Sequence, residues 1–225
     1  MIHWLVARPG AGLDKAEFLL PEELAEGARF RHPGRRRQWL LGRAAAKVLL
    51  LRLRGVGGNA AAARSLRIVR QDAGWPQACT AAGEPLPLSL SISHSGERAL
   101  CAVCPKAVGA LGADLEKIEP RSAAFLEDFY TEAERRLLSR LSGRERETAV
   151  NAVWSLKEAL LKALWSGLRR RATDIEILSL GALAADGWRR PRLRAAGRTD
   201  ARGLWRTSAD GRFVLALGLI GGATS

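Results

Sequence analysis

Cysteine is scarce in this sequence. It holds three, Cys79, Cys101 and Cys104, and an odd number cannot all pair within one chain, which suits a reducing compartment. Cys101 and Cys104 have the CxxC spacing, but residues 99–104 are typical of a strand, where positions three apart face opposite sides. No second CxxC follows, as a structural zinc site would require. The pattern therefore predicts core thiols rather than a zinc site.

Long hydrophobic runs are absent. No stretch approaches the roughly 18 apolar residues of a membrane span, and the longest run, 213–222, fits a strand. The first nine residues lack the basic start and the apolar length of a secretory signal. We therefore expect a cytoplasmic protein with no membrane partner.

Acidic residues are the minority among the charges. The chain of 225 residues has 36 Lys and Arg against 23 Asp and Glu, a formal net charge of +13. Such an excess permits an anionic partner. Neither GxGxxG nor GxxxxGK[ST] occurs, so the common nucleotide-binding loops are missing. A basic nucleic-acid-binding protein is an alternative interpretation, but the seven tryptophans are scattered and no helix-turn-helix or zinc signature supports it.

The hydrophobic pattern predicts an α+β fold. Hydrophobic residues make up 47% of the chain, enough for a core. Helices are predicted at 35–51, 122–142, where Thr131 offers an N-cap, and 146–167. Strands are predicted at 2–7, 65–70, 88–93, 99–104, 108–115, 174–179, 202–208 and 212–220.

A weak internal repeat divides the chain. Glycines of similar turns, Gly74 and Gly187, lie 113 residues apart, and the lysines Lys47 and Lys162 of the two long helices lie 115 apart. A constant offset of half the chain predicts two similar subdomains with pseudo-twofold symmetry, 1–106 and 107–225. In each we expect a small, mostly antiparallel sheet with a long helix packed on it.

Two carboxylates lie two residues apart in a predicted strand. Asp114 and Glu116 therefore share one face of the strand and need a cation between them. Oxygen ligands suit Mg²⁺, and Glu158, one helical turn before Lys162, could complete the site. The alternatives are a strand end that faces solvent and a surface ion pair between Glu158 and Lys162.

His94 lies between Ser93 and Ser95 at a strand end, a setting that suits a phosphate-binding site, although a structural histidine is the alternative. Arginines gather at the start of the first long helix, where they oppose the helix dipole unless an anion binds there. A solvated helix face is the other explanation for these arginines.

These signals occur in a characteristic order. SISHSG at 91–96, LGADLEK at 111–117, FYTEAE at 129–134 and WSLKEALLK at 154–162 together resemble the Sfp-type 4′-phosphopantetheinyl transferase family over about residues 30–180. The resemblance implies two α+β halves in one chain. It also implies that Mg²⁺ supports transfer of the phosphopantetheine arm of coenzyme A to a serine of an apo acyl, peptidyl or aryl carrier protein. The second product is 3′,5′-ADP.

The resemblance also implies roles for particular residues. Asp114, Glu116 and Glu158 match the metal ligands, Glu158 also matches a general base toward the carrier serine, and Lys162 matches a contact to the pyrophosphate. The expected contacts to coenzyme A are Ser93, His94, Lys157, Lys162, Arg36, Arg37, Arg43, Trp75 and Pro76. Trp75 stands where the family often has a lysine, so the charge of that contact is missing here.

We expect residues 1–106 to contact the nucleotide, and residues 107–225 to supply the carboxylates and the catalytic helix. Partners are expected to be coenzyme A and a carrier protein of fatty-acid, polyketide or nonribosomal-peptide synthesis, with no nucleic acid. Acidic carriers would complement the basic surface. We expect a monomer, and a carrier-binding relative without activity is a further alternative, opposed by the intact acidic residues and Lys162. Trp154 and Trp165 are expected to anchor the catalytic helix in the core.

Overall fold

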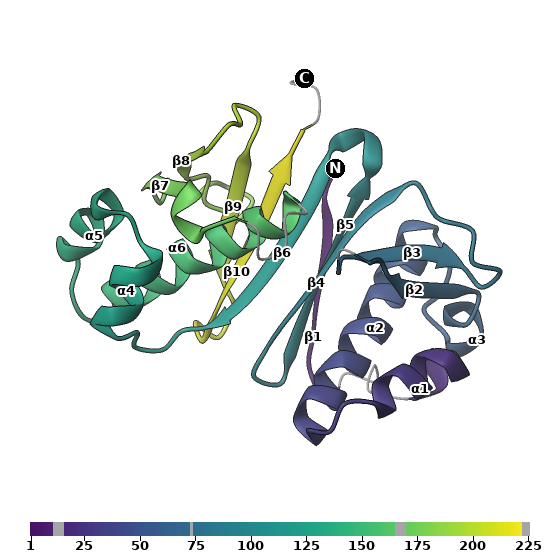
Figure 1. Cartoon of the computed structure of the whole chain (residues 1–225). Helices are drawn as coiled ribbons and strands as arrows, with labels where there is room; N and C mark the ends of the chain where they lie inside the picture. Colours follow the sequence, from purple (N-terminus) through teal and green to yellow (C-terminus); the bar gives the residue numbers. More distant parts are fainter. Residues whose placement is uncertain (11–15, 73, 165–169, 222–225) are drawn as a thin grey trace. The chain divides into compact units, whose positions relative to one another are not determined.

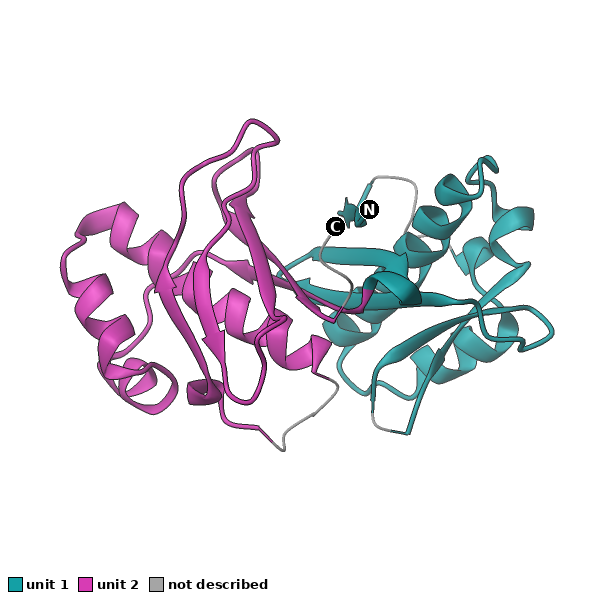
Figure 2. Cartoon of the chain, turned by 90° about the horizontal axis from the view of Figure 1, so that it is seen from above, with its two compact units in different colours: residues 1–108 teal, residues 109–225 magenta. Residues whose placement is uncertain are grey.

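The computed structural model describes residues 1–10, 16–72, 74–164 and 170–221. The chain divides into two compact units, Met1–Val108 and Gly109–Ser225, coloured separately in Figure 2. The boundary lies two residues beyond the one expected from the internal repeat. Trp165, expected as a core anchor, lies outside the described residues.

Unit 1 is built on a three-stranded antiparallel sheet of order β1-β5-β4 (Figure 1). The strands are β1 (His3–Ala7), β4 (Leu88–Ser95) and β5 (Arg98–Pro105). Strand β5 is buried along almost its whole length because it is central. The tight turn between β4 and β5 includes Gly96, whose φ of 55° suits a residue without a side chain. Helix α2 (Pro33–Leu53) begins with proline in its first turn and packs on this sheet.

Unit 1 also contains several shorter elements. They are η1 (Ala16–Phe18), α1 (Pro21–Ala28), α3 (Ala60–Ala63), β2 (Leu66–Arg70), β3 (Pro76–Thr80) and η2 (Lys106–Val108). Strands β2 and β3 form a separate antiparallel pair. Strand β3 was not predicted from the sequence because it begins at Pro76, directly after a turn.

Unit 2 repeats this plan. Its sheet has the order β6-β10-β9, from β6 (Ala110–Lys117), β9 (Arg202–Thr207) and β10 (Phe213–Ile220), and helix α6 (Gly143–Ala163) packs on it (Figure 1). A second pair joins β7 (Ile175–Ser179) to β8 (Arg192–Ala195). The other elements are α4 (Ala123–Phe129), α5 (Glu132–Ser139) and η4 (Ala172–Asp174). The predicted α+β class and the small antiparallel sheets are confirmed.

The structure corrects the register of the repeat. Lys47 of α2 forms a buried ion pair with Glu23, and the residue in the same place in unit 2 is Lys157, whose Nζ lies 2.7 Å from Glu134. Both carboxylates also accept backbone N–H groups, that of Glu23 from Ile68 and that of Glu134 from Ile177. Lys47 therefore corresponds to Lys157, and its expected match with Lys162 was wrong.

The predicted helix over 122–142 is two helices, α4 and α5. Helix α4 ends at Phe129, and Thr131 caps α5: its Oγ1 accepts from the backbone N–H of Glu134, and the carboxylate of Glu134 accepts from the N–H of Thr131. The predicted cap is thus confirmed, whereas the continuity of the helix was wrong. The extended backbone at Thr131, with φ −69° and ψ 161°, breaks the helical ladder.

A row of glycines lets α6 lie against its sheet at close range. Gly112 of β6 is paired with Gly218 of β10, which is paired in turn with Gly203 of β9. A Cβ at Gly112 would lie 1.8 Å from the backbone oxygen of Ala159 in α6, and one at Gly218 would lie 2.7 Å from the nitrogen of Leu160. The missing side chains therefore set the distance between α6 and β6.

The three cysteines are buried thiols, as predicted: Cys79 is 3% exposed, Cys101 0% and Cys104 1%. Burial raises the pKa of Cys101 to about 12, so this thiol stays protonated and unreactive. Among the described residues, no helix combines the length and the hydropathy needed to span a membrane.

Candidate active site

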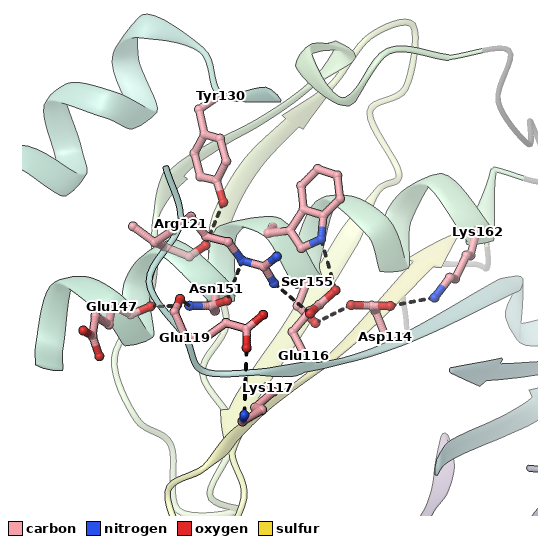
Figure 3. Close-up of polar contacts among 12 residues, drawn as sticks. Asp114, Glu116, Lys117, Glu119, Arg121, Tyr130, Glu147, Asn151, Ser155 and Lys162 are labelled. Carbon is pink, nitrogen blue, oxygen red and sulfur yellow. Dashed lines mark hydrogen bonds and ion pairs between the residues drawn. The ribbon is translucent and has the colours of Figure 1, made fainter. Parts of the chain in front are cut away.

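Two acidic side chains of β6 lie beside helix α6 (Figure 3). Asp114 and Glu116 are two residues apart on the strand and share the face that meets the helix. Asp114 is buried, and the side chain of Glu116 is 23% exposed. The predicted pairing on one strand face is confirmed, but the pair does not lie at a solvated strand end.

Asp114 is bound by two side chains of α6. Its Oδ2 accepts a hydrogen bond of 2.9 Å from Ser155 Oγ, and its Oδ1 lies 2.6 Å from Lys162 Nζ. Lys162 also donates to the backbone oxygen of Ala113 at 3.2 Å. The lysine therefore spans from helix to strand, and its ammonium balances the charge of Asp114.

Glu116 is bound by donors from two different segments. Trp154 Nε1 donates to its Oε1 at 3.1 Å, and the guanidinium of Arg121 donates to its Oε2 at 2.9 Å. Burial and the negative charge of Asp114 raise the pKa of Glu116, while Arg121 and Trp154 oppose the rise. Trp154 thus does more than anchor the helix, because it orients one of the candidate ligands.

Glu158 lies on α6 one turn after Trp154 and one turn before Lys162. Burial raises the pKa of its carboxyl, the charge of Asp114 raises it further, and the ammonium of Lys162 opposes the rise. The site therefore combines three carboxylates, two of them with pKa values raised partly by the third. This is the electrostatic setting that a bound cation relieves.

The donor chemistry of the site fits Mg²⁺. All three candidate ligands supply oxygen, and Mg²⁺ characteristically takes one or two protein carboxylates together with phosphate oxygens and water. Within the described ranges, no three histidine, cysteine or acidic side chains gather closely enough to hold a metal ion by themselves. Asp114 and Glu116 would therefore hold the ion with Glu158 nearby, and a phosphate-bearing ligand would complete its coordination.

The histidine expected to contact phosphate lies in unit 1. Ser93 and His94 are on β4, beside helix α2, and Ser93 is buried. Gly42 of α2 makes room for the imidazole, because a Cβ there would lie 2.2 Å from His94 Nε2. Cys101 Sγ donates to the backbone oxygen of the same glycine at 3.3 Å. The helix therefore touches the sheet at the point where His94 sits.

The candidate arginines of α2 differ in their surroundings. Arg36 and Arg37 are exposed, and Arg37 borders a pocket of about 230 Å³ that Gly96 and Glu97 also line. Arg43 is 6% exposed and lies over the ring of Trp39 at 4.8 Å, and burial lowers its pKa. Its Nε has no hydrogen-bond partner among the described residues.

Trp75 and Pro76 are half-buried where the turn enters β3. Both lie in unit 1 with the other expected nucleotide contacts Ser93, His94, Arg36, Arg37 and Arg43. Asp114, Glu116, Glu158 and Lys162 all lie in unit 2, where the structure brings them together.

Lys157 is not placed to bind coenzyme A, and that expectation was wrong. Its side chain is fully buried, and its Nζ lies 2.7 Å from Glu134 and donates to the backbone oxygens of Phe129 at 2.9 Å and Ala172 at 3.2 Å. Loss of water lowers the pKa of this lysine, against the opposing pull of Glu134. Its role is structural, as is that of Lys47 in unit 1.

Sequence reasoning missed three residues of the site: Ser155, Arg121 and Asn151. Ser155 follows Trp154 directly, and both meet β6 from the same helix. Arg121 lies five residues after Glu116, beyond the end of the strand, and its Nε donates to Asn151 Oδ1 at 3.1 Å. Arg121 lies in a connecting segment, which has no helical or strand periodicity from which a role could be predicted. Only the polar residues on the inner face of α6, Ser155 and Asn151, offered a signal in the sequence.

Comparison with known proteins gives concordant results. The family model for the 4′-phosphopantetheinyl transferase superfamily matches residues 110–216. The 4′-phosphopantetheinyl transferase HetI of Nostoc sp. strain PCC 7120 is 30% identical over 166 residues, which are 73% of this chain and 66% of that protein. The chain thus covers slightly less than two thirds of that relative's length.

Two solved structures are also similar. One is holo-[acyl-carrier-protein] synthase of Thermotoga maritima, 28% identical, covering 52% of this chain and 64% of that chain with a TM-score of 0.39. The other is a holo-(acyl-carrier-protein) synthase of Bacillus anthracis in complex with CoA (3′,5′-ADP), 26% identical, covering 52% and 97% with a TM-score of 0.39. The sequence matches confirm the resemblance, and the chain belongs to the 4′-phosphopantetheinyl transferase superfamily.

Proposed function

We propose that the protein transfers the 4′-phosphopantetheine arm of coenzyme A to a serine of an apo acyl, peptidyl or aryl carrier protein, in the manner of an Sfp-type or holo-[acyl-carrier-protein] synthase enzyme. Family membership supports the reaction class. The observation that carries the proposal is the acidic pair of β6, Asp114 and Glu116, with Lys162 of α6 2.6 Å from Asp114. Carboxylates for a hard cation beside an ammonium for phosphate are what pyrophosphate chemistry needs.

The acidic residues supply two functions in this proposal. Asp114 and Glu116, with Glu158 nearby, would hold Mg²⁺, which when bound would offset the charge on the pyrophosphate oxygens. Glu158 also accepts the proton of the carrier serine, directly or through one water, as the serine oxygen attacks the phosphorus that bears the pantetheine arm. A raised pKa suits Glu158 to this task, because it makes the carboxylate a stronger base.

The leaving group is stabilised by a cation of the chain. As the new serine O–P bond forms, the P–O bond within the pyrophosphate breaks and 3′,5′-ADP departs. Lys162 contacts the pyrophosphate and can give a proton to the departing phosphate. Because the ammonium of Lys162 lies 2.6 Å from Asp114, it must either release this carboxylate or contact the carboxylate and the phosphate together. Glu158 and Lys162, one turn apart on α6, thus handle the two proton transfers from the same helix.

Residues of unit 1 bind the nucleotide in this proposal. Ser93 and His94 contact the phosphates of coenzyme A, with His94 on the 3′-phosphate, and Trp75 and Pro76 border the adenosine. Arg36 and Arg37 are exposed and basic, as contacts to a phosphate require. Arg43 is the least exposed of the three arginines, so it would contribute its charge to phosphate binding from a buried position.

The carrier protein is expected to be acidic. A net charge of +13 would steer an acidic carrier toward the enzyme and would make the association rate fall with ionic strength. We place the reaction in the cytoplasm, in fatty-acid, polyketide or nonribosomal-peptide synthesis, with a monomeric enzyme.

The test is the mass of a carrier protein. The full chain is incubated with coenzyme A, Mg²⁺ and each of an acidic acyl carrier and a peptidyl carrier. A gain of one phosphopantetheine, abolished by a chelator and restored by Mg²⁺, is expected. No gain with any carrier, together with tight and salt-sensitive binding of DNA or RNA, would replace the proposal by nucleic-acid binding.

A further inference from the structure

Arg121 is held on helix α6 independently of the carboxylate it binds. Its Nε donates to Asn151 Oδ1 at 3.1 Å, and its guanidinium lies 5.1 Å from the centre of the Phe125 ring. Asn151 is fully buried, and its amide N–H groups donate to the backbone oxygens of Glu119 at 2.9 Å and Glu147 at 2.8 Å. The asparagine is therefore fixed by the backbone, and it fixes the arginine.

The same arginine neutralises Glu116. Its terminal nitrogen lies 2.9 Å from Oε2 of this carboxylate (Figure 3). Trp154 Nε1 donates to Oε1. The side chain of Arg121 is 19% exposed and that of Glu116 23%, so water screens this pair only in part. Both carboxylate oxygens of Glu116 thus carry a donor, and one of the donors is a full positive charge.

We propose that Arg121 is a positioning residue that serves as the counter-ion of Glu116 and yields this carboxylate to a divalent cation when one binds. This inference rests on the proposed function, because it concerns the proposed metal site. The guanidinium stays beside the site after it releases Glu116, since Asn151 still holds its Nε. Arg121 therefore weakens cation binding by charge repulsion and keeps the empty acidic pair neutral.

The charge makes the expected effect measurable. A positive charge a few ångströms from a bound divalent cation repels it, and in a partly solvated setting its removal strengthens binding by about tenfold. Loss of the hydrogen bonds without loss of charge would leave the affinity close to that of the unchanged protein. Neutral and charge-conserving variants of Arg121 therefore separate its charge from its contacts.

The experiment measures Mn²⁺ binding to the full chain by electron paramagnetic resonance, with coenzyme A present and without carrier. Arg121→Gln is expected to bind Mn²⁺ about tenfold more tightly, and Arg121→Lys within about threefold of the unchanged protein. Arg136→Gln removes a charge from an exposed pair with Glu132 on α5 and is the matched control, with no change expected. Should Arg121→Gln fail to fold, Arg121→Met carries the same test.

Other outcomes overturn the inference. An affinity of Arg121→Gln equal to or weaker than that of the unchanged protein means that the arginine is not a competing counter-ion. Equal tightening in Arg121→Lys means that charge is not the cause. If the unchanged protein transfers phosphopantetheine and binds Mn²⁺, such results refute the role of Arg121 alone. If it neither transfers nor binds Mn²⁺, the proposed function fails as well.

Discussion

Gly112→Ala is expected to separate helix α6 from strand β6. The new Cβ would lie 1.8 Å from the backbone oxygen of Ala159, 1.6 Å short of the 3.4 Å at which ordinary contact begins. Both partners belong to regular backbone, so neither can swing aside as a flexible side chain would. Overpacking usually costs about 1–3 kcal/mol, and a clash of this depth between two backbones belongs at the upper end of that range.

The same displacement acts on the site. Asp114 follows Gly112 by two residues on β6, and its partner Lys162 lies on α6, so a shift of α6 lengthens their contact of 2.6 Å. A misplacement near 1 Å can lower an enzymatic rate by about a hundredfold. Urea unfolding and the transfer rate are measured together. Gly57→Ala, where nothing lies within 4 Å, is the control and should change neither. An unfolding free energy of Gly112→Ala equal to that of the control would refute the packing argument.

Three further predictions concern other parts of the chain. Lys157→Met leaves the buried carboxylate of Glu134 without its cation and should lower the free energy of unfolding by about 3–5 kcal/mol. The affinity of the folded variant for coenzyme A, measured by calorimetry, should be unchanged. A weaker affinity would show that Lys157 is a ligand of coenzyme A after all. Gly42→Ala places a methyl group 2.2 Å from His94 Nε2, so the preference for coenzyme A over its 3′-dephospho form should disappear, and an unchanged preference would remove His94 from the 3′-phosphate. Glu158 has a raised pKa in the folded protein, so its stabilising contribution is present below the ordinary value of 4.5 and is lost as pH rises through the raised value. Glu158→Gln should therefore unfold at higher urea than the unchanged protein at pH 8 and at the same urea near pH 4, whereas a difference independent of pH would contradict the assignment.

The elements that hold the site could be predicted because their signals are local. Strand β6 alternates its two acids with core residues, and α6 is a run of good helix formers without proline. Strand β8 was not predicted, since it has only four residues, and only Ala195 among them is buried, so it carries little pattern. The break at Thr131 was visible as a cap, but the hydrophobic pattern continues on both sides of it.

Which lysine faces the site could not be predicted from the sequence. Lys157 and Lys162 lie five residues apart on α6, which places them about 140° apart around the helix axis, so only one of them can face β6. The other meets Glu134, whose place depends on how α5 packs against α6. Arg121 was missed for the same reason, because its contacts with Glu116 and Asn151 are set by tertiary structure.

The central claim is that the acidic pair of β6 is the chemical centre of a phosphopantetheine transfer. Its most direct test is the mass of an apo carrier after incubation with coenzyme A, Mg²⁺ and either the unchanged enzyme or Asp114→Ala. Asp186→Ala, which alters an exposed carboxylate paired with Arg190, is the matched control. The account predicts one added phosphopantetheine with the unchanged enzyme and with Asp186→Ala, and none with a folded Asp114→Ala. Full modification of the carrier by Asp114→Ala at the unchanged rate would contradict it.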